Sequence, residues 1–201
     1  MITHLFFDIG GVLGSNGWGS AERARAVERF GLDGQDFDRR HREVVGPWEE
    51  GRLTLDEYLD STVFDVPRPF TRDAFRAFML EQSAPSREVI ALAGALAAGG
   101  RYRLMTLNNE SAELNAYRLR SFGLAPVFAA FYSSCWLGVT KPARRIYELA
   151  LAISQADPAQ SVVIDDREQN LAPARALGMR GLRFTTVEAL RRDLAANGVA
   201  V

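Results

Sequence analysis

Charged side chains follow several short apolar runs along this chain. Asp8 comes directly after the first run, and the pair Asp165 and Asp166 comes directly after a later one. A lysine, Lys141, stands shortly after a run between them. Paired carboxylates bind hard cations such as Mg²⁺, and a cation and a lysine together neutralise a phosphoryl group that another carboxylate can attack. These residue types therefore indicate phosphoryl chemistry.

The apolar runs have the lengths of buried strands and are separated by helix-like stretches. This alternation predicts an α/β fold with a Rossmann-like, doubly wound parallel sheet. Ligands bind beyond the carboxyl ends of such strands, so Asn108 and Asn109 join the candidate residues. Pro142 is expected to open its helix and Pro173 to lie in a first turn. The predicted strands are 2–7, 102–107, 128–134, 161–164 and 180–185, and the helices are 86–98, 142–153, 170–177 and 187–196.

A purely helical stretch interrupts this alternation after the first strand. Thr54 and Glu57 have the spacing of a capping box, and Thr71 can cap the helix that follows it. We expect an inserted helical-bundle cap over 19–81, with a core made of 1–18 and 82–201. The helices predicted in the insertion are 21–30, 35–45, 54–62 and 71–80.

Composition restricts the class of protein. The chain has 201 residues with 47% hydrophobic and 24% charged residues, which is typical of a soluble globular protein. The formal net charge of -1 gives no reason to expect nucleic acid or an anionic membrane as a partner. The single cysteine, Cys135, excludes an intramolecular disulfide, and no signal-peptide pattern opens the sequence. A cytoplasmic location is therefore expected, while the oligomeric state is left open.

The order of these motifs resembles the haloacid dehalogenase (HAD) superfamily over most of the chain. The first motif of that family corresponds to Phe7-Asp8-Ile9-Gly10-Gly11-Val12-Leu13. The third corresponds to Lys141-Pro142, and the fourth to Val163-Ile164-Asp165-Asp166-Arg167. Members with a helical cap between motifs one and two are most similar, including bacterial sugar-phosphate phosphatases and the amino-terminal phosphatase domain of soluble epoxide hydrolases.

The resemblance implies a role for each site residue. Asp8 would attack phosphorus and form an aspartyl phosphate, and Lys141 would pair with the phosphoryl oxygens. Mg²⁺ would be held by Asp8, the Gly10 carbonyl and Asp166. Asp165 would bind the metal through water or orient Lys141. The expected substrate is a small phosphate ester such as a sugar phosphate.

The second motif departs from the family pattern. Leu107 stands where relatives have Ser or Thr, and Thr106 comes one residue early. Because alternation along a strand turns Thr106 to the other face, Asn108 and nearby backbone N–H groups are expected to hold phosphate, together with Asn109 and Lys141. Thr106 is a substitute only if the alignment shifts.

Gly10 is the larger departure, because most phosphatases of the family have an aspartate there as general acid and base. General acid catalysis is typically worth about 10²–10⁴-fold, so slow turnover of esters with poor leaving groups is expected. A cap residue is one possible replacement. His41 is the titratable candidate, although a surface position on its helix is the favoured interpretation.

Two other functions are consistent with these residues. A haloacid dehalogenase also uses an aspartate nucleophile and lacks the second aspartate, but the acidic pair Asp165-Asp166 favours a metal and phosphate. A catalytically silent phosphate-binding protein is consistent with Gly10 and Leu107. The requirement for a divalent ion and the effect of Asp8→Asn separate these alternatives.

Overall fold

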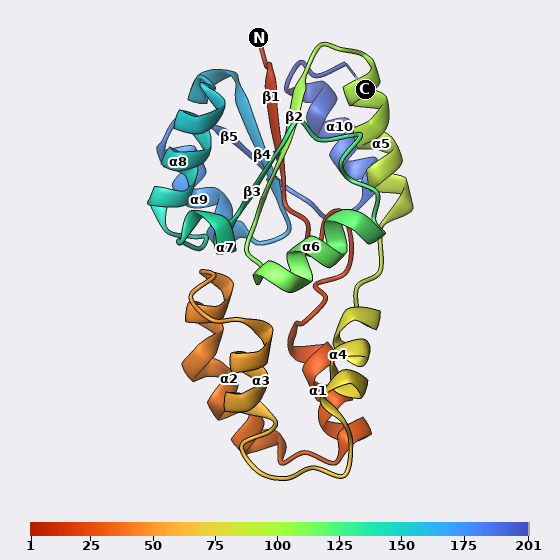
Figure 1. Ribbon diagram of the computed structural model, residues 1–201. Helices are drawn as coiled ribbons and strands as arrows, with labels where there is room; N and C mark the ends of the chain where they lie inside the picture. Colours follow the sequence, from red (N-terminus) through yellow and green to blue (C-terminus); the bar gives the residue numbers. More distant parts are fainter. Residues whose placement is uncertain (201) are drawn as a thin grey trace.

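A five-stranded parallel sheet forms the centre of the upper half of the molecule in Figure 1. The computed structural model describes residues 1–200. The strand order is β3-β2-β1-β4-β5, with helices on both faces, which confirms the predicted doubly wound α/β fold. All five predicted strands are present: β1 (His4–Phe7), β2 (Arg103–Asn108), β3 (Ala130–Ser133), β4 (Ser161–Asp165) and β5 (Arg180–Arg183).

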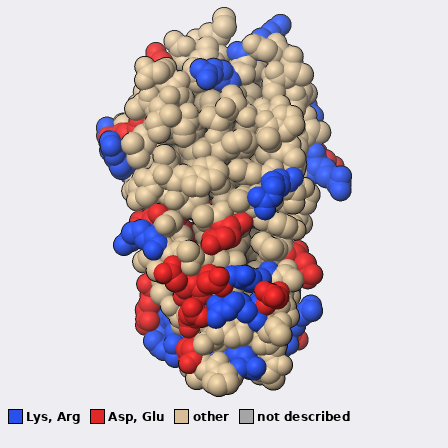
Figure 2. All heavy atoms as spheres, in the orientation of Figure 1, with Lys and Arg blue, Asp and Glu red and all other residues tan. Residues whose placement is uncertain are grey.

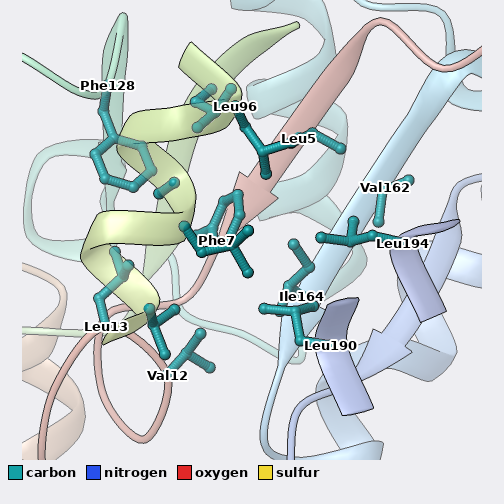
Figure 3. Packing of buried hydrophobic residues seen from close by; sticks show 14 of the residues in the cluster. Leu5, Phe7, Val12, Leu13, Leu96, Phe128, Val162, Ile164, Leu190 and Leu194 are labelled. Atoms are coloured by element: carbon teal, nitrogen blue, oxygen red, sulfur yellow. The ribbon is translucent and has the colours of Figure 1, made fainter. Parts of the chain in front are cut away.

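Apolar side chains alternate between the two faces of the sheet and bury a helix layer on each. Leu5, Phe7 and Ile164 pack in one cluster with residues of two helices, as Figure 3 shows. Phe6 and Val163 point the other way and pack against two further helices. The first pair of helices is α5 (Arg87–Ala98) and α10 (Val187–Ala196), and the second pair is α8 (Arg144–Ser154) and α9 (Glu168–Ala176).

Two of these helices begin elsewhere than the sequence predicted. The prediction that Pro142 opens α8 is wrong, because the residues before Arg144 form a turn in which Ala143 N donates to Thr140 O over 3.0 Å. Pro173 lies inside α9 rather than in its first turn. The cause is an earlier helix start at Glu168.

Two short helices of the sheet half were not predicted. They are α6 (Ala112–Ser121) and α7 (Ser134–Leu137), and α6 lies across the end of the sheet that faces the lower half of the molecule. Asn115 and Arg118 of α6 are buried although they are polar. A 3₁₀ turn, Pro158–Gln160, precedes β4.

Four helices form the lower half of the molecule, called here the helical part (Figure 1). Thr54 accepts a hydrogen bond from Glu57 N, and the Glu57 side chain accepts one in return, so the predicted capping box is confirmed. Thr71 caps the last helix as predicted. Aromatic side chains dominate the apolar cluster between these helices. The helices are α1 (Ser20–Phe30), α2 (Gly34–Glu49), α3 (Leu55–Thr62) and α4 (Arg72–Glu81).

The two chain segments that join the halves are hydrogen-bonded to each other. Ser15 N donates to Ala84 O over 2.8 Å, and the Ser15 hydroxyl donates to Gln82 O over 2.7 Å. Arg118 of α6 donates to Ser15 O and to the Ser83 hydroxyl. One buried guanidinium therefore ties both connections to the sheet half.

Charged side chains gather on the helical part, whereas the sheet half is mostly uncharged on the face in Figure 2. Positive and negative side chains are mixed on the helical part, and many of them form ion pairs, such as Arg40 with Asp65. The face in view therefore presents no surface of a single charge. Among residues 1–200, no helix combines the length and the apolar character that crossing a membrane requires.

Candidate active site

The site lies where the strand order of the sheet reverses, between β1 and β4. These strands pair with Phe7 opposite Ile164, so Asp8 and Asp165, the next residues, end neighbouring strands side by side. Asp8 N donates to Ile164 O over 2.9 Å and holds this arrangement. Ligands of doubly wound sheets bind at such reversal points.

Lys141 joins these two carboxylates. Its Nζ lies 3.0 Å from Asp8 Oδ2 and 2.6 Å from Asp165 Oδ2. Lys141 is 5% exposed and Asp8 is 8% exposed, so the charges face each other with little water between them. Asn109 fixes the lysine loop, because its amide donates to Lys141 O over 2.8 Å and its Oδ1 accepts from Lys141 N over 2.7 Å.

The low exposure changes the pKa values of this pair. Burial raises the pKa of Asp8 to about 7, although the charge of Lys141 opposes the rise. Burial alone would lower the pKa of Lys141, but the carboxylates of Asp8 and Asp165 outweigh it and raise that pKa. The lysine is therefore a fixed positive charge, and a cation beside Asp8 would favour its ionised form.

The two acids of the pair Asp165-Asp166 differ in their surroundings. Asp165 accepts hydrogen bonds from Arg167 N over 2.9 Å and from the Asn170 amide over 3.0 Å, in addition to its ion pair with Lys141. By contrast, Asp166 Oδ1 is buried and has no hydrogen-bond partner among residues 1–200. A buried oxygen of this kind is costly unless a cation or water binds it.

The geometry around Asp166 fits a metal ion. One carboxylate oxygen each from Asp8, Asp165 and Asp166 lie within 4.8 Å of one another. Gly11 adopts φ +74°, and a Cβ there would lie 2.5 Å from Asp166 Oδ2, so only glycine leaves room for this carboxylate. The Gly10 carbonyl accepts no backbone hydrogen bond within the described chain. Oxygen ligands are thus available on neighbouring elements.

The structure does not bring the Asn108 side chain to this site, contrary to the sequence prediction. Its amide donates to Asn115 Oδ1 over 3.1 Å, and its Oδ1 accepts from the Ser133 hydroxyl over 3.0 Å. The reason is the strand alternation already applied to Thr106, since residues 106 and 108 point to the same face. Thr106 is fully buried, and its hydroxyl has no hydrogen-bond partner among the residues that the structure describes.

A cavity of about 370 Å³ opens in front of Asp8 and Lys141, and residues of both halves line it. Asp8, Lys141, Asp165 and Asp166 are called the sheet rim below. The side facing them is called the helical wall, and it consists of Trp18, Arg23, His41, Trp48 and Glu49.

The helical wall is organised around Tyr58, which is fully buried. Trp18 Nε1 donates to the Tyr58 hydroxyl over 2.8 Å, and His41 Nδ1 is hydrogen-bonded to the same hydroxyl over 3.0 Å. Trp48 stacks on the Tyr58 ring with a centroid distance of 4.0 Å. The expected surface position for His41 is therefore wrong: it is buried, and burial lowers its pKa to about 4.

Sequence reasoning missed four charged residues that line the cavity: Arg23, Glu49, Glu110 and Arg118. Glu110 and Arg118 form a buried ion pair over 3.3 Å. Glu110 follows β2 and the two asparagines, so its place at a strand end was a usable signal. Glu49 had no such signal, because the predicted helix ended at Val45 whereas α2 continues to Glu49.

The comparisons with known proteins agree with one another. A family model described as haloacid dehalogenase-like hydrolase matches residues 2–178. The chain is 26% identical over 199 residues to D-ribitol-5-phosphate phosphatase of Bacteroides thetaiotaomicron, which covers 89% of each protein. It is 35% identical over 71 residues to bifunctional epoxide hydrolase 2 of Sus scrofa, which covers 35% of this chain and 13% of that protein.

Solved structures share the fold. A HAD-like family hydrolase from Porphyromonas gingivalis has a TM-score of 0.77 at 24% identity, covering 96% of this chain and 98% of that one. A HAD family enzyme from Bacteroides thetaiotaomicron, in complex with magnesium and inorganic phosphate, has a TM-score of 0.79 at 19% identity over 93% and 96%. L-2-haloacid dehalogenase from Xanthobacter autotrophicus scores 0.64 at 20% identity over 100% and 85%.

Proposed function

The chain belongs to the haloacid dehalogenase-like hydrolases, and from this premise we propose that it is a magnesium-dependent phosphatase of a small phosphorylated metabolite. One observation carries the proposal: Asp8, Lys141 and the unpartnered oxygen of Asp166 meet at the reversal point of the sheet. The similarity to a ribitol-phosphate phosphatase over 89% of each protein supports the substrate class. A structurally similar enzyme from Bacteroides thetaiotaomicron was solved in complex with magnesium and inorganic phosphate, which supports magnesium as the cofactor.

Asp8 is the proposed nucleophile. One of its carboxylate oxygens attacks phosphorus, the bond from phosphorus to the ester oxygen breaks, and an aspartyl phosphate forms. Water then attacks this phosphorus, inorganic phosphate leaves, and the Asp8 carboxylate is restored. Lys141 lies 3.0 Å from Asp8, so it lowers the cost of the negative charge that builds up on the phosphoryl oxygens.

Asp8, Asp166 and the Gly10 carbonyl are the groups that would hold Mg²⁺. When bound, the ion supplies a Lewis acid that withdraws charge from the phosphoryl oxygens. Asp165 has a different proposed role, because its oxygens already accept from Lys141, Arg167 N and Asn170. It orients the lysine rather than binding the metal.

Residues 19–81 are proposed to act as a cap over a core of 1–18 and 82–201. The cavity between them has the volume of a small-molecule site, so large phosphoproteins are poor substrates for it. Arg23 and Trp48 line the helical wall. Arg23 Nε lies 3.6 Å from Asp38 Oδ1, whereas Trp48 Nε1 is buried without a hydrogen-bond partner in the described chain. A substrate hydroxyl group that reached Trp48 Nε1 would satisfy this donor, which favours a sugar phosphate or an alditol phosphate.

The test is a panel of sugar, alditol and aryl phosphates, assayed after metal removal and again with Mg²⁺. We expect turnover only with Mg²⁺ and a loss of roughly 10⁴-fold or more in Asp8→Asn. Metal-independent release of halide from 2-haloacids would make the protein a dehalogenase instead. Absence of turnover on every ester would contradict the proposal and favour a silent phosphate-binding protein.

A further inference from the structure

Position 10 has no side chain to move a proton, although it lies at the cavity beside the nucleophile. A Cβ on Gly10 would point toward Asn16 Oδ1, 3.5 Å away, and toward Arg118 Nη1, 3.7 Å away. Neither group can act as a general acid near neutral pH. A proton for the leaving oxygen must therefore come from another side chain that lines the cavity, or from water.

Three side chains of the cavity titrate and do not belong to the sheet rim: His41, Glu49 and Glu110. His41 is held by the Tyr58 hydroxyl, and burial lowers its pKa to about 4, so it carries no proton to donate at neutral pH. Glu110 is held by Arg118 over 3.3 Å and accepts from Ser111 N over 3.0 Å. The side chains of His41 and Glu110 are therefore held by contacts within the protein.

Glu49 differs from the other two. Its carboxylate makes no hydrogen bond and no ion pair within residues 1–200, and it lines the cavity opposite the nucleophile. The backbone fixes its position, because Glu49 O accepts a 2.6 Å hydrogen bond from the Ser134 hydroxyl in the sheet half. Glu49 is also the last residue of α2, so this contact holds the end of the helical wall against the sheet half.

From this placement we infer that Glu49 is the proton donor to the leaving oxygen and the proton acceptor for the attacking water, in place of the residue absent at position 10. The inference rests on the proposed phosphatase function. In the first step, Asp8 attacks phosphorus, the ester P–O bond breaks, and the Glu49 carboxyl gives its proton to the departing oxygen. In the second step, Glu49 takes a proton from water as that water attacks phosphorus and Asp8 leaves.

The environment of Glu49 suits both steps. Burial, together with the charges of Glu110 and Asp8, raises its pKa to about 7. Arg167 and Lys141, which also face it, act in the opposite direction. A carboxyl that is close to half protonated at neutral pH can both donate and accept a proton.

The experiment compares Glu49→Gln with the wild type, with Mg²⁺ present, on an alkyl phosphate of the panel and on 4-nitrophenyl phosphate. The quantity is kcat/KM, which reports on the phosphorylation step. An alkoxide needs a proton as it leaves, whereas 4-nitrophenolate does not. We expect Glu49→Gln to lose about 10²-fold on the alkyl ester and less than about threefold on the aryl ester. Glu50→Gln is the matched control, because Glu50 pairs with Arg52 and does not line the cavity.

Two further readouts separate proton transfer from a structural effect. The alkyl-ester kcat/KM of the wild type should fall as the pH rises through about 7, because the donor loses its proton, and Glu49→Gln should lack this fall. With the aryl ester, the variant should release a burst of 4-nitrophenolate and accumulate phosphorylated enzyme that mass spectrometry detects on Asp8.

Equal losses on both esters, or unchanged kcat/KM on the alkyl ester, would overturn the assignment of Glu49 and leave the phosphatase function standing. A wild type that hydrolyses no ester with Mg²⁺ overturns the proposed function, and the assignment of Glu49 falls with it. The wild-type assay therefore distinguishes the two failures.

Discussion

The two sides of the cavity are built on different principles. On the sheet rim, Lys141 is bonded to Asp8 and Asp165 at 3.0 and 2.6 Å, and the sheet register fixes where those carboxylates stand. On the helical wall, Arg23 Nε lies 3.6 Å from Asp38 Oδ1, and Trp48 Nε1 has no hydrogen-bond partner within the described chain. The rim pairs its lysine with two of its three carboxylates and leaves one oxygen of Asp166 for a cation, whereas the wall has a donor, Trp48 Nε1, without a partner in the described chain.

This difference separates reaction from recognition. A rim whose lysine is already paired with two carboxylates is preorganised for one reaction and tolerates little change. A wall with an unsatisfied donor gains a hydrogen bond only when a polar ligand reaches that donor. Substitutions at the rim should therefore act on kcat and on stability. Those in the wall should act on KM, except at Glu49, which is proposed to transfer protons.

The largest effect is expected for Lys141→Met, which leaves two buried carboxylates without their common partner. We expect loss of measurable phosphatase activity and a decrease of roughly 3–5 kcal/mol in the free energy of unfolding. Urea denaturation at pH 8 measures the second quantity. Arg144→Met is the control, because Arg144 pairs with Glu148 on an exposed helix surface, where such a pair is worth about 0–1 kcal/mol. Similar losses in both variants would contradict a preorganised rim.

Gly11→Ala tests the cation site of the rim. The new Cβ would lie 2.5 Å from Asp166 Oδ2, so the carboxylate must move. We expect the Mg²⁺ concentration for half-maximal activity to rise by about tenfold or more. Gly31→Ala is the control, since Gly31 also has a positive φ but no atom within 4 Å of a Cβ.

Both glycine variants should lose about 1–2 kcal/mol of stability from the left-handed backbone alone. Only Gly11→Ala should change the magnesium requirement. A change of equal size in Gly31→Ala would mean that backbone strain, and not the position of Asp166, controls metal binding.

The rim was largely predictable from sequence and the wall was not. Asp8, Lys141 and Asp165 follow apolar strands, and in a parallel sheet such positions meet at one edge whatever the details of packing. Asn108 was misplaced although the necessary rule was available, because alternation had been applied to Thr106 and not two residues further along. The family assignment from these motifs is confirmed.

The wrong predictions of helix bounds and the missed helix lie where tertiary packing outweighs the local sequence pattern. The prediction ended α2 at Val45, directly before Gly46 and Pro47, but the helix continues to Glu49. Pro47 removes only the hydrogen bond to the carbonyl of Glu43, which is exposed, so water can replace it. The wall residues Trp48 and Glu49 reach the cavity through this extra turn. Helix α6 was missed because some of its buried side chains are polar, so its sequence lacks the regular apolar spacing that predicts a helix.

Tyr58→Phe tests whether the wall acts on substrate binding. The variant removes the hydroxyl shared by Trp18 and His41, and it leaves a buried indole N–H without a partner. We expect a loss of about 1–3 kcal/mol in unfolding free energy. The KM for the best substrate should rise severalfold while kcat changes little. Tyr102→Phe is the control, because within residues 1–200 the Tyr102 hydroxyl accepts only from Ala200 N, and Tyr102 does not line the cavity. A fall in kcat with unchanged KM would place Tyr58 in the chemistry of the rim instead.

The smallest effect distinguishes the two histidines, one in each half of the molecule. Burial and the charge of Arg23 lower the pKa of His41 to about 4. The unfolded chain, with a histidine pKa of 6.5, therefore takes up a proton that the folded chain does not. The stability that this difference provides is complete above pH 6.5 and is lost as the pH falls toward 4.

His41→Gln should remove this part of the pH dependence, which we expect to be roughly 1–2 kcal/mol between pH 7 and 4.5. Thermal unfolding of the wild type and of the variant across that range measures it. His4→Gln is the comparison from the sheet half: burial lowers the pKa of His4 too, but this side chain in β1 is only partly buried, so the change should be smaller. If His4→Gln flattens the pH dependence more than His41→Gln does, the buried histidine of the helical wall is not the source of the acid sensitivity.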